Sequence, residues 1–110
     1  MKGTTNPRKR EIIEKLYARK EPIFNAIAKE LERPARHSVD VNLSKIDKYA
    51  KDKGAVIIPG KVLGNGELKK DVTVVAYAFS EAALKKIQKK MTLAELLEKN
   101  IKIKGLQILK

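Results

Sequence analysis

Residues 54–80 read GAVIIPGKVLGNGELKKDVTVVAYAFS, and this stretch decides the fold. It holds two β-branched apolar runs, at 56–58 and 72–79, each bounded by turn-forming residues, so we expect two strands, the first ending at Pro59-Gly60. The connection is rich in glycine and lysine: Gly60, Lys61, Gly64, Gly66, Lys69 and Lys70. Glycine opens backbone conformations that other residues avoid, and lysine adds positive charge, so this loop is predicted to grip phosphate. Asn65-Gly66 is predicted to form a tight turn within it.

Amphipathic stretches on both sides of this segment predict helices. Two are expected as an antiparallel N-terminal pair, beginning at Pro7 and Pro22, because proline loses no hydrogen bond at the first helical position. Their apolar residues recur with a helical period: Ile12, Ile13, Leu16, Tyr17, Phe24, Ile27, Ala28 and Leu31. Three further helices are expected after the capping residues Asn42, Ser80 and Thr92.

The third helix is expected to run to about Asp52, with Gly54 as its left-handed stop. Residues 106–109 are predicted to add a last strand. Helices between strands imply parallel crossovers, so the fold class is predicted to be α/β, with a small irregular mixed sheet, strand–helix crossovers and an N-terminal helical pair. We expect a basic arm at 1–10 and a single globular domain at 11–110.

Charge dominates the composition. The chain has 25 lysines and arginines against 13 aspartates and glutamates, a formal net charge of +12. Residues 1–53 carry 14 basic and 8 acidic side chains, and residues 54–110 carry 11 and 5, so each half has a net charge of +6. This even spread favours a domain whose body faces nucleic acid. A membrane surface is the rival anionic partner, but a chain with no tryptophan and two phenylalanines lacks the aromatic and apolar helix face that membrane binding needs.

The absence of cysteine excludes disulfides, thiolate zinc sites and cysteine nucleophiles. The first residues, MKGTTNPRKR, lack the apolar core of a signal peptide. We therefore expect a cytoplasmic protein.

Three basic segments are candidate RNA contacts. Residues 1–10 contain Lys2, Arg8, Lys9 and Arg10 and no acidic side chain, so they are predicted to be unstructured until they fold along a phosphate backbone. The alternative is a solvated terminus without a role.

The second segment, ERPARHSVD at 32–40, holds Arg33, Arg36 and His37. A single histidine without a carboxylate cluster cannot build a metal site, so His37 is either an ordinary surface residue or an RNA contact. The third segment is the polar side of the fourth helix, which is an RNA-facing patch or a solvated face: Lys85, Lys86, Lys89 and Lys90.

Motifs for catalysis and nucleotide binding do not fit. The 60–66 segment lacks the Gly-Lys-Ser/Thr of a Walker loop, and Lys69 stands where a Rossmann fingerprint needs its third glycine. One histidine, no cysteine and serines at 38, 44 and 80 offer no catalytic triad. We predict a non-enzyme with no catalytic residue, cofactor, metal or small-molecule substrate.

Several motifs resemble one family: NPR near the start, LERP before a basic loop, VNLSKIDKYA, and above all PGKVLGNG followed by DVTV. From about Asn6 to the C-terminus the chain is similar to ribosomal protein eighteen-e, the archaeal and eukaryotic relative of bacterial large-subunit protein fifteen, and its length is similar to that of the archaeal members. Ala35 departs from the consecutive basic residues usual there, which puts a contact at that point in doubt. The residues that match family motifs are Asn6, Arg8, Arg36, Asn42, Lys61, Gly64 and Gly66.

This resemblance implies a structural constituent of the large ribosomal subunit, with ribosomal RNA and neighbouring ribosomal proteins as partners. The expected RNA-binding residues are Lys2, Arg8, Lys9, Arg10, Arg33, Arg36, His37, Lys61, Asn65, Lys69 and Lys70. The same charges equally permit an extra-ribosomal RNA- or DNA-binding regulator, and a hydrolase with an unrecognised site is a third, more distant alternative.

Overall fold

A computed structural model describes residues 7–32, 39–99, 101, 103 and 105–109. The chain divides into two compact units, residues 1–38 and residues 39–110, and each is described by itself. Whether residues 11–110 act as one domain stays a prediction.

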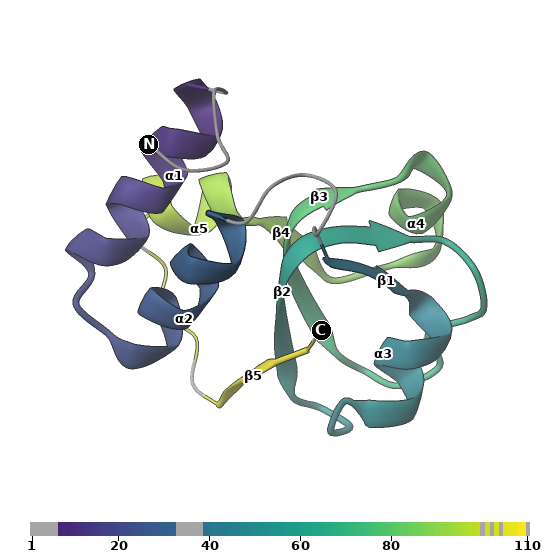
Figure 1. Ribbon diagram of the computed structural model, residues 1–110. Coiled ribbons are helices and arrows are strands. Elements are labelled where there is room, and N and C mark those ends of the chain that lie inside the picture. The colour runs from purple at the N-terminus through teal and green to yellow at the C-terminus, as the bar shows by residue number, and fades with distance from the viewer. Residues whose placement is uncertain (1–6, 33–38, 100, 102, 104, 110) are drawn as a thin grey trace. The chain divides into compact units, whose positions relative to one another are not determined.

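The first unit contains a helical hairpin. Helices α1 (Pro7–Ala18) and α2 (Pro22–Leu31) pack against each other in opposite directions (Figure 1). Both begin at a proline, as the sequence predicts. The buried residues of the pair are those with helical spacing: Ile12, Ile13, Leu16, Phe24, Ile27, Ala28 and Leu31. Tyr17 is instead 37 % exposed and donates its hydroxyl to the Glu32 carboxylate, which raises the pKa of Tyr17.

The predicted unstructured arm is shorter than expected. Residues 7–10 are the first turn of α1, so the prediction that they are disordered is wrong. Pro7 presets the helical backbone angle, and α2 supplies a packing partner that lowers the entropic cost of helix formation. Residues 1–6 lie outside the described residues.

The second unit is built on a parallel sheet. Its strands are β1 (Val39–Asn42), β2 (Ala55–Leu63), β3 (Thr73–Phe79), β4 (Lys90–Thr92) and β5 (Leu106–Ile108). Central strand β2 pairs with β3 on one edge, while β1 and β5 share the other edge, and β4 continues the sheet beyond β3. All four pairings are parallel, as the strand–helix crossovers predicted, and the α/β class is confirmed.

Strand β2 does not end at Pro59-Gly60, which corrects the sequence prediction. It runs on to Leu63, and both residues are buried within it. The register with β3 shifts between Ile58 and Lys61, so the proline sits where the hydrogen-bond ladder is interrupted. A bulge is the place in a sheet where a missing backbone N–H does least harm.

Helices α3 (Leu43–Tyr49) and α4 (Glu81–Lys86) supply side chains to the main core on one face of the sheet. Helix α5 (Leu93–Glu98) buries Leu93 and Leu96 and packs against β3 from the other side (Figure 1). The core contains Val41, Leu43, Ile46, Ala50, Val56, Ile58, Val62, Val72, Val74, Ala76, Ala83, Ile87 and Leu109.

Two predicted helix caps are confirmed. The Ser80 hydroxyl accepts from the Ala83 amide, and the Thr92 hydroxyl accepts from the Glu95 amide, each at 3.2 Å. Asn42 occupies the N-cap position of α3 but makes no side-chain capping bond there.

The end of α3 differs from the prediction. The helix ends at Tyr49 and not near Asp52, and the left-handed residue that follows is Lys53, with φ of 64°, in place of Gly54.

Candidate nucleic-acid interface

The predicted contact residues fall into three groups. Arg8, Lys9 and Arg10 form the first turn of α1 in the first unit. The second unit carries Lys61 on β2, and Asn65, Lys69 and Lys70 on the connection between β2 and β3, which we call the 64–72 loop. The rest lie outside the described residues: Lys2, Arg33, Arg36 and His37.

The glycines of this region serve packing. Gly60 lies within β2, and Gly66, with φ of 88°, is the one of the three predicted phosphate-loop glycines with a left-handed backbone. A Cβ on Gly64 would lie 2.5 Å from the Ala82 Cβ, and one on Gly66 would lie 2.9 Å from the Ser44 amide nitrogen. The loop therefore approaches α4 and α3 too closely for a side chain, so its glycines do not form the exposed phosphate cradle that we expected.

Helix α3 holds the loop through its polar groups. The Ser44 amide donates to the Asn65 carbonyl at 3.1 Å. One oxygen of Asp47 accepts from the backbone amides of Lys69 and Lys70, at 2.9 and 3.1 Å. These two bonds stabilise the carboxylate and lower the pKa of Asp47.

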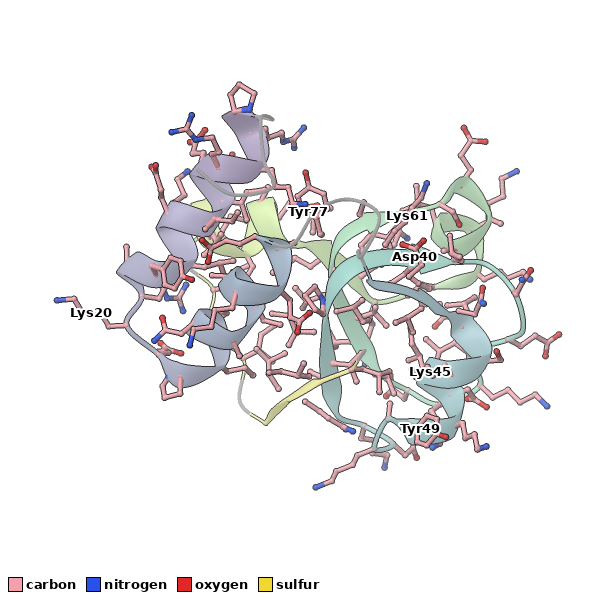
Figure 2. The ribbon with its side chains drawn as sticks, in the orientation of Figure 1. Lys20, Asp40, Lys45, Tyr49, Lys61 and Tyr77 are labelled. Atoms are coloured by element: carbon pink, nitrogen blue, oxygen red, sulfur yellow. The ribbon has the colours of Figure 1, made fainter. Side chains whose placement is uncertain are left out.

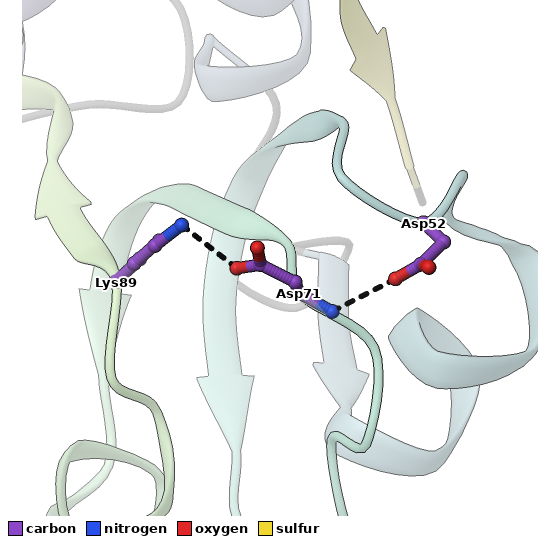
Figure 3. Close-up of polar contacts among 3 residues, drawn as sticks. All are labelled: Asp52, Asp71 and Lys89. Atoms are coloured by element: carbon purple, nitrogen blue, oxygen red, sulfur yellow. Dashed lines mark hydrogen bonds and ion pairs between the residues drawn. The ribbon is translucent and has the colours of Figure 1, made fainter.

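The end of the loop is held by a second carboxylate. The Asp71 amide donates to Asp52 Oδ1 at 3.0 Å, and Asp71 Oδ1 lies 2.8 Å from Lys89 Nζ (Figure 3). Asp71 thus links the segment after α3 to the segment after α4.

Several lysines also brace the fold. Lys86 Nζ donates to the carbonyls of Gly64 at 2.8 Å and Gly66 at 3.1 Å, and Lys70 Nζ donates to the Ala50 carbonyl at 2.8 Å. Helix α4 ends at Lys86, and Lys90 is already the first residue of β4. The predicted helical face of four lysines is therefore wrong, because only Lys85 and Lys86 lie on α4.

This bracing brings lysines from two separate segments around one open pocket. The pocket, of about 390 Å³, is lined by Lys69 and Lys70 from the loop and by Lys86 and Lys89 from the end of α4 and beyond. Sequence reasoning selected the loop lysines and left Lys86 and Lys89 undecided, since no spacing along the chain relates the two pairs. Lys61 lies elsewhere, exposed on β2 beside its register partner Asp40 on β1 (Figure 2).

Within the described ranges there is no group of three or more histidine, cysteine, aspartate or glutamate side chains that could hold a metal ion. Among the same residues, no helix is long and apolar enough to cross a membrane.

The Asp47 contacts predict a pH-dependent stability. Asp47→Asn should lower the melting temperature at pH 7, since the amide keeps an acceptor oxygen but loses the charge that the two amides stabilise. A lowered folded-state pKa stabilises the fold above the unfolded-state pKa, near about 4, and this contribution is lost as the pH falls through the folded value. The difference between wild type and variant should therefore shrink on acidification below about pH 4.

Thermal unfolding followed by circular dichroism at several pH values measures this difference. Asp40→Asn, on exposed β1, makes the same change of charge away from the loop and serves as the control. A pH-independent difference for Asp47→Asn would contradict the electrostatic role of Asp47.

Known proteins place the chain in a family. Residues 26–90 match the model of a family described as ribosomal proteins 50S-L15 and 50S-L18e with their 60S counterpart, over more than half of the chain. The chain belongs to this family. The matched range of this L15/L18e family runs from within α2 to the first residue of β4, so it includes the 64–72 loop and all four pocket lysines.

Individual members of the L15/L18e family agree over more of the chain. It is 45 % identical over 107 residues to large ribosomal subunit protein eL18 of Methanococcus maripaludis, covering 90 % of this chain and 89 % of that protein. It is 50 % identical over 91 residues to eL18 of Nanoarchaeum equitans, covering 80 % and 76 %. With eL18 of Sulfurisphaera tokodaii it shares 45 % identity over 87 residues, covering 79 % and 74 %. The predicted family is confirmed.

Proposed function

We propose that this chain is a structural constituent of the large ribosomal subunit and acts by binding ribosomal RNA. The observation that carries the proposal is the extended identity to archaeal proteins named eL18. The net charge of +12 supports it, because a polyanionic partner compensates charge that the protein itself leaves uncompensated. Its place is then the ribosome in the cytoplasm, with other ribosomal proteins as neighbours.

Binding of this kind needs no chemistry from the protein. Lysine and arginine side chains neutralise phosphates and release the counterions condensed on the RNA, which gives affinity and makes it depend on salt. The residues we propose for these contacts are Arg8, Lys9, Arg10, Lys61, Asn65, Lys69 and Lys70, together with Lys2, Arg33, Arg36 and His37. The role is therefore structural and not enzymatic, and it requires no cofactor.

The first turn of α1 supports a functional reading of its charges. Arg8, Lys9 and Arg10 stand at the positive end of the helix dipole, and this turn contains no acidic residue. Cations at this position oppose the dipole, so the helix itself gains nothing from them. A phosphate partner explains their presence.

Cosedimentation tests the proposed function. An epitope-tagged copy expressed in an archaeal host should travel with the large subunit in a sucrose gradient and stay with it through a high-salt wash. A basic protein of the same charge without ribosomal ancestry, tagged in the same way, should be removed by that wash, because non-specific phosphate binding falls steeply with salt. A tagged chain that leaves the subunit but still binds free RNA or DNA would instead identify an extra-ribosomal regulator.

A further inference from the structure

We propose that the pocket between the 64–72 loop and the end of α4 binds one phosphodiester group of the RNA backbone. This inference rests on the proposed function and names one of its contact sites. The pocket is lined by four lysines, by Asp71 and Gln88, and by Leu68 and Val72. Its volume of about 390 Å³ falls in the usual range of ligand sites.

The lysines of the pocket are held in place before any ligand arrives. Lys86 is fixed by two carbonyls, Lys70 by one, and Lys89 by the Asp71 carboxylate. An ammonium group has three donors, so Lys86 keeps one and Lys70 keeps two for a ligand. Fixing these side chains beforehand reduces the entropy that binding would otherwise lose.

The charge of the pocket suits a single anion. Its lining has four ammonium groups and one carboxylate, that of Asp71. Two more carboxylates contact this region, and both accept backbone amides: Asp47 from Lys69 and Lys70, and Asp52 from Asp71. With these included the site remains positive by one charge, which matches one phosphodiester.

The remaining lining favours backbone over base recognition. None of the eight lining residues is aromatic, so the pocket offers no ring on which a base can stack. Gln88 adds an amide that can donate to a phosphate oxygen, and Leu68 and Val72 provide apolar surface. A contact of this kind positions RNA without reading its sequence.

Lys69 is the residue that tests the pocket most cleanly. Its backbone amide bonds to Asp47, while its exposed ammonium is not among the braces of the loop. Lys69→Ala should therefore leave the melting temperature unchanged and reduce the slope of log affinity against log salt by about 0.7–0.9. Lys69→Arg should keep the slope, because arginine also neutralises a phosphate.

The matched control is Lys85→Ala, an exposed lysine of α4 that does not line the pocket. The measurement is fluorescence anisotropy with archaeal large-subunit ribosomal RNA across a series of KCl concentrations. We expect a smaller slope for Lys69→Ala and an unchanged slope for Lys85→Ala. Equal effects of the two variants, or no effect of Lys69→Ala, would overturn the pocket.

A second measurement separates this inference from the proposed function. Titration of the isotope-labelled chain with inorganic phosphate, followed by NMR, should shift the amide signals of Lys69, Lys70 and Asp71 in wild type and less in Lys69→Ala. Phosphate shifts without binding to ribosomal RNA would sink the ribosomal proposal and retain an anion site. Binding to ribosomal RNA with no change at these amides would retain the ribosomal proposal and reject the pocket.

Discussion

Gly64→Ala should lower the melting temperature by roughly 10 °C, corresponding to a loss of about 2–3 kcal/mol in the free energy of unfolding. The new Cβ would lie 2.5 Å from the Ala82 Cβ, 2.9 Å from the Ala82 carbonyl carbon and 3.0 Å from the Ala83 nitrogen. Two of these atoms are backbone of α4, so relief requires the helix to move. Since Ala83 is fully buried in the core, this movement opens the packing beneath α4. Thermal unfolding by calorimetry measures the loss.

Two variants separate close approach from backbone strain. Gly105→Ala places a Cβ in open space at φ of 70°, so it should cost only about 1 kcal/mol from left-handed strain. Ala82→Gly combined with Gly64→Ala removes the 2.5 Å contact but leaves the two backbone contacts, so it should recover part of the loss. A Gly64→Ala protein that is as stable as wild type would show that the loop does not press on α4.

The triple variant Arg8→Ala, Lys9→Ala, Arg10→Ala should weaken binding to archaeal large-subunit ribosomal RNA more than any single change. Each lost phosphate contact removes somewhat under one unit of salt slope, so three contacts remove roughly 2–2.7 units. At about 0.2 M salt the same relation gives a loss of roughly fourfold per contact for duplex-like RNA, or roughly 80-fold for three. Filter binding across a salt series measures both quantities.

Stability should not explain this effect. Alanine is the best helix former, and removing cations from the first turn of α1 relieves their conflict with the helix dipole. The triple variant should therefore unfold at the same temperature as wild type or slightly higher. As a control, Lys15→Ala removes one charge from the same helix, where Lys15 pairs with Glu11 at 3.1 Å, and should change the slope little. A triple variant with an unchanged salt slope would reject the α1 contact.

Features with a local cause could be predicted from the sequence. Pro7 and Pro22 begin their helices, and Ser80 and Thr92 cap theirs, because these effects act within one helical turn. The long apolar run before Ser80 is a strand for a similar reason, since β-branched residues fit a buried pleated surface. The family, too, was predicted correctly from local motifs.

Features decided by distant partners could not be predicted. Strands β1 and β4 are short and contain charged or amide side chains, and their state depends on pairing with β2 and β3. The roles of Gly64 and Gly66 depend on helices that approach from both sides. The same holds for the lysine pocket, because only the folded chain brings residues 86 and 89 beside residues 69 and 70.

The shared edge of β2 has a consequence for synthesis. Its first half pairs with β5, which lies about fifty residues later in the chain, and Leu109 then donates its amide to the Ile57 carbonyl. Until that segment has been made, an apolar strand edge with unsatisfied backbone groups stays open on the nascent chain. Such an edge can pair with other chains and aggregate. The folding chain therefore needs a chaperone or early RNA binding to protect this edge during that interval.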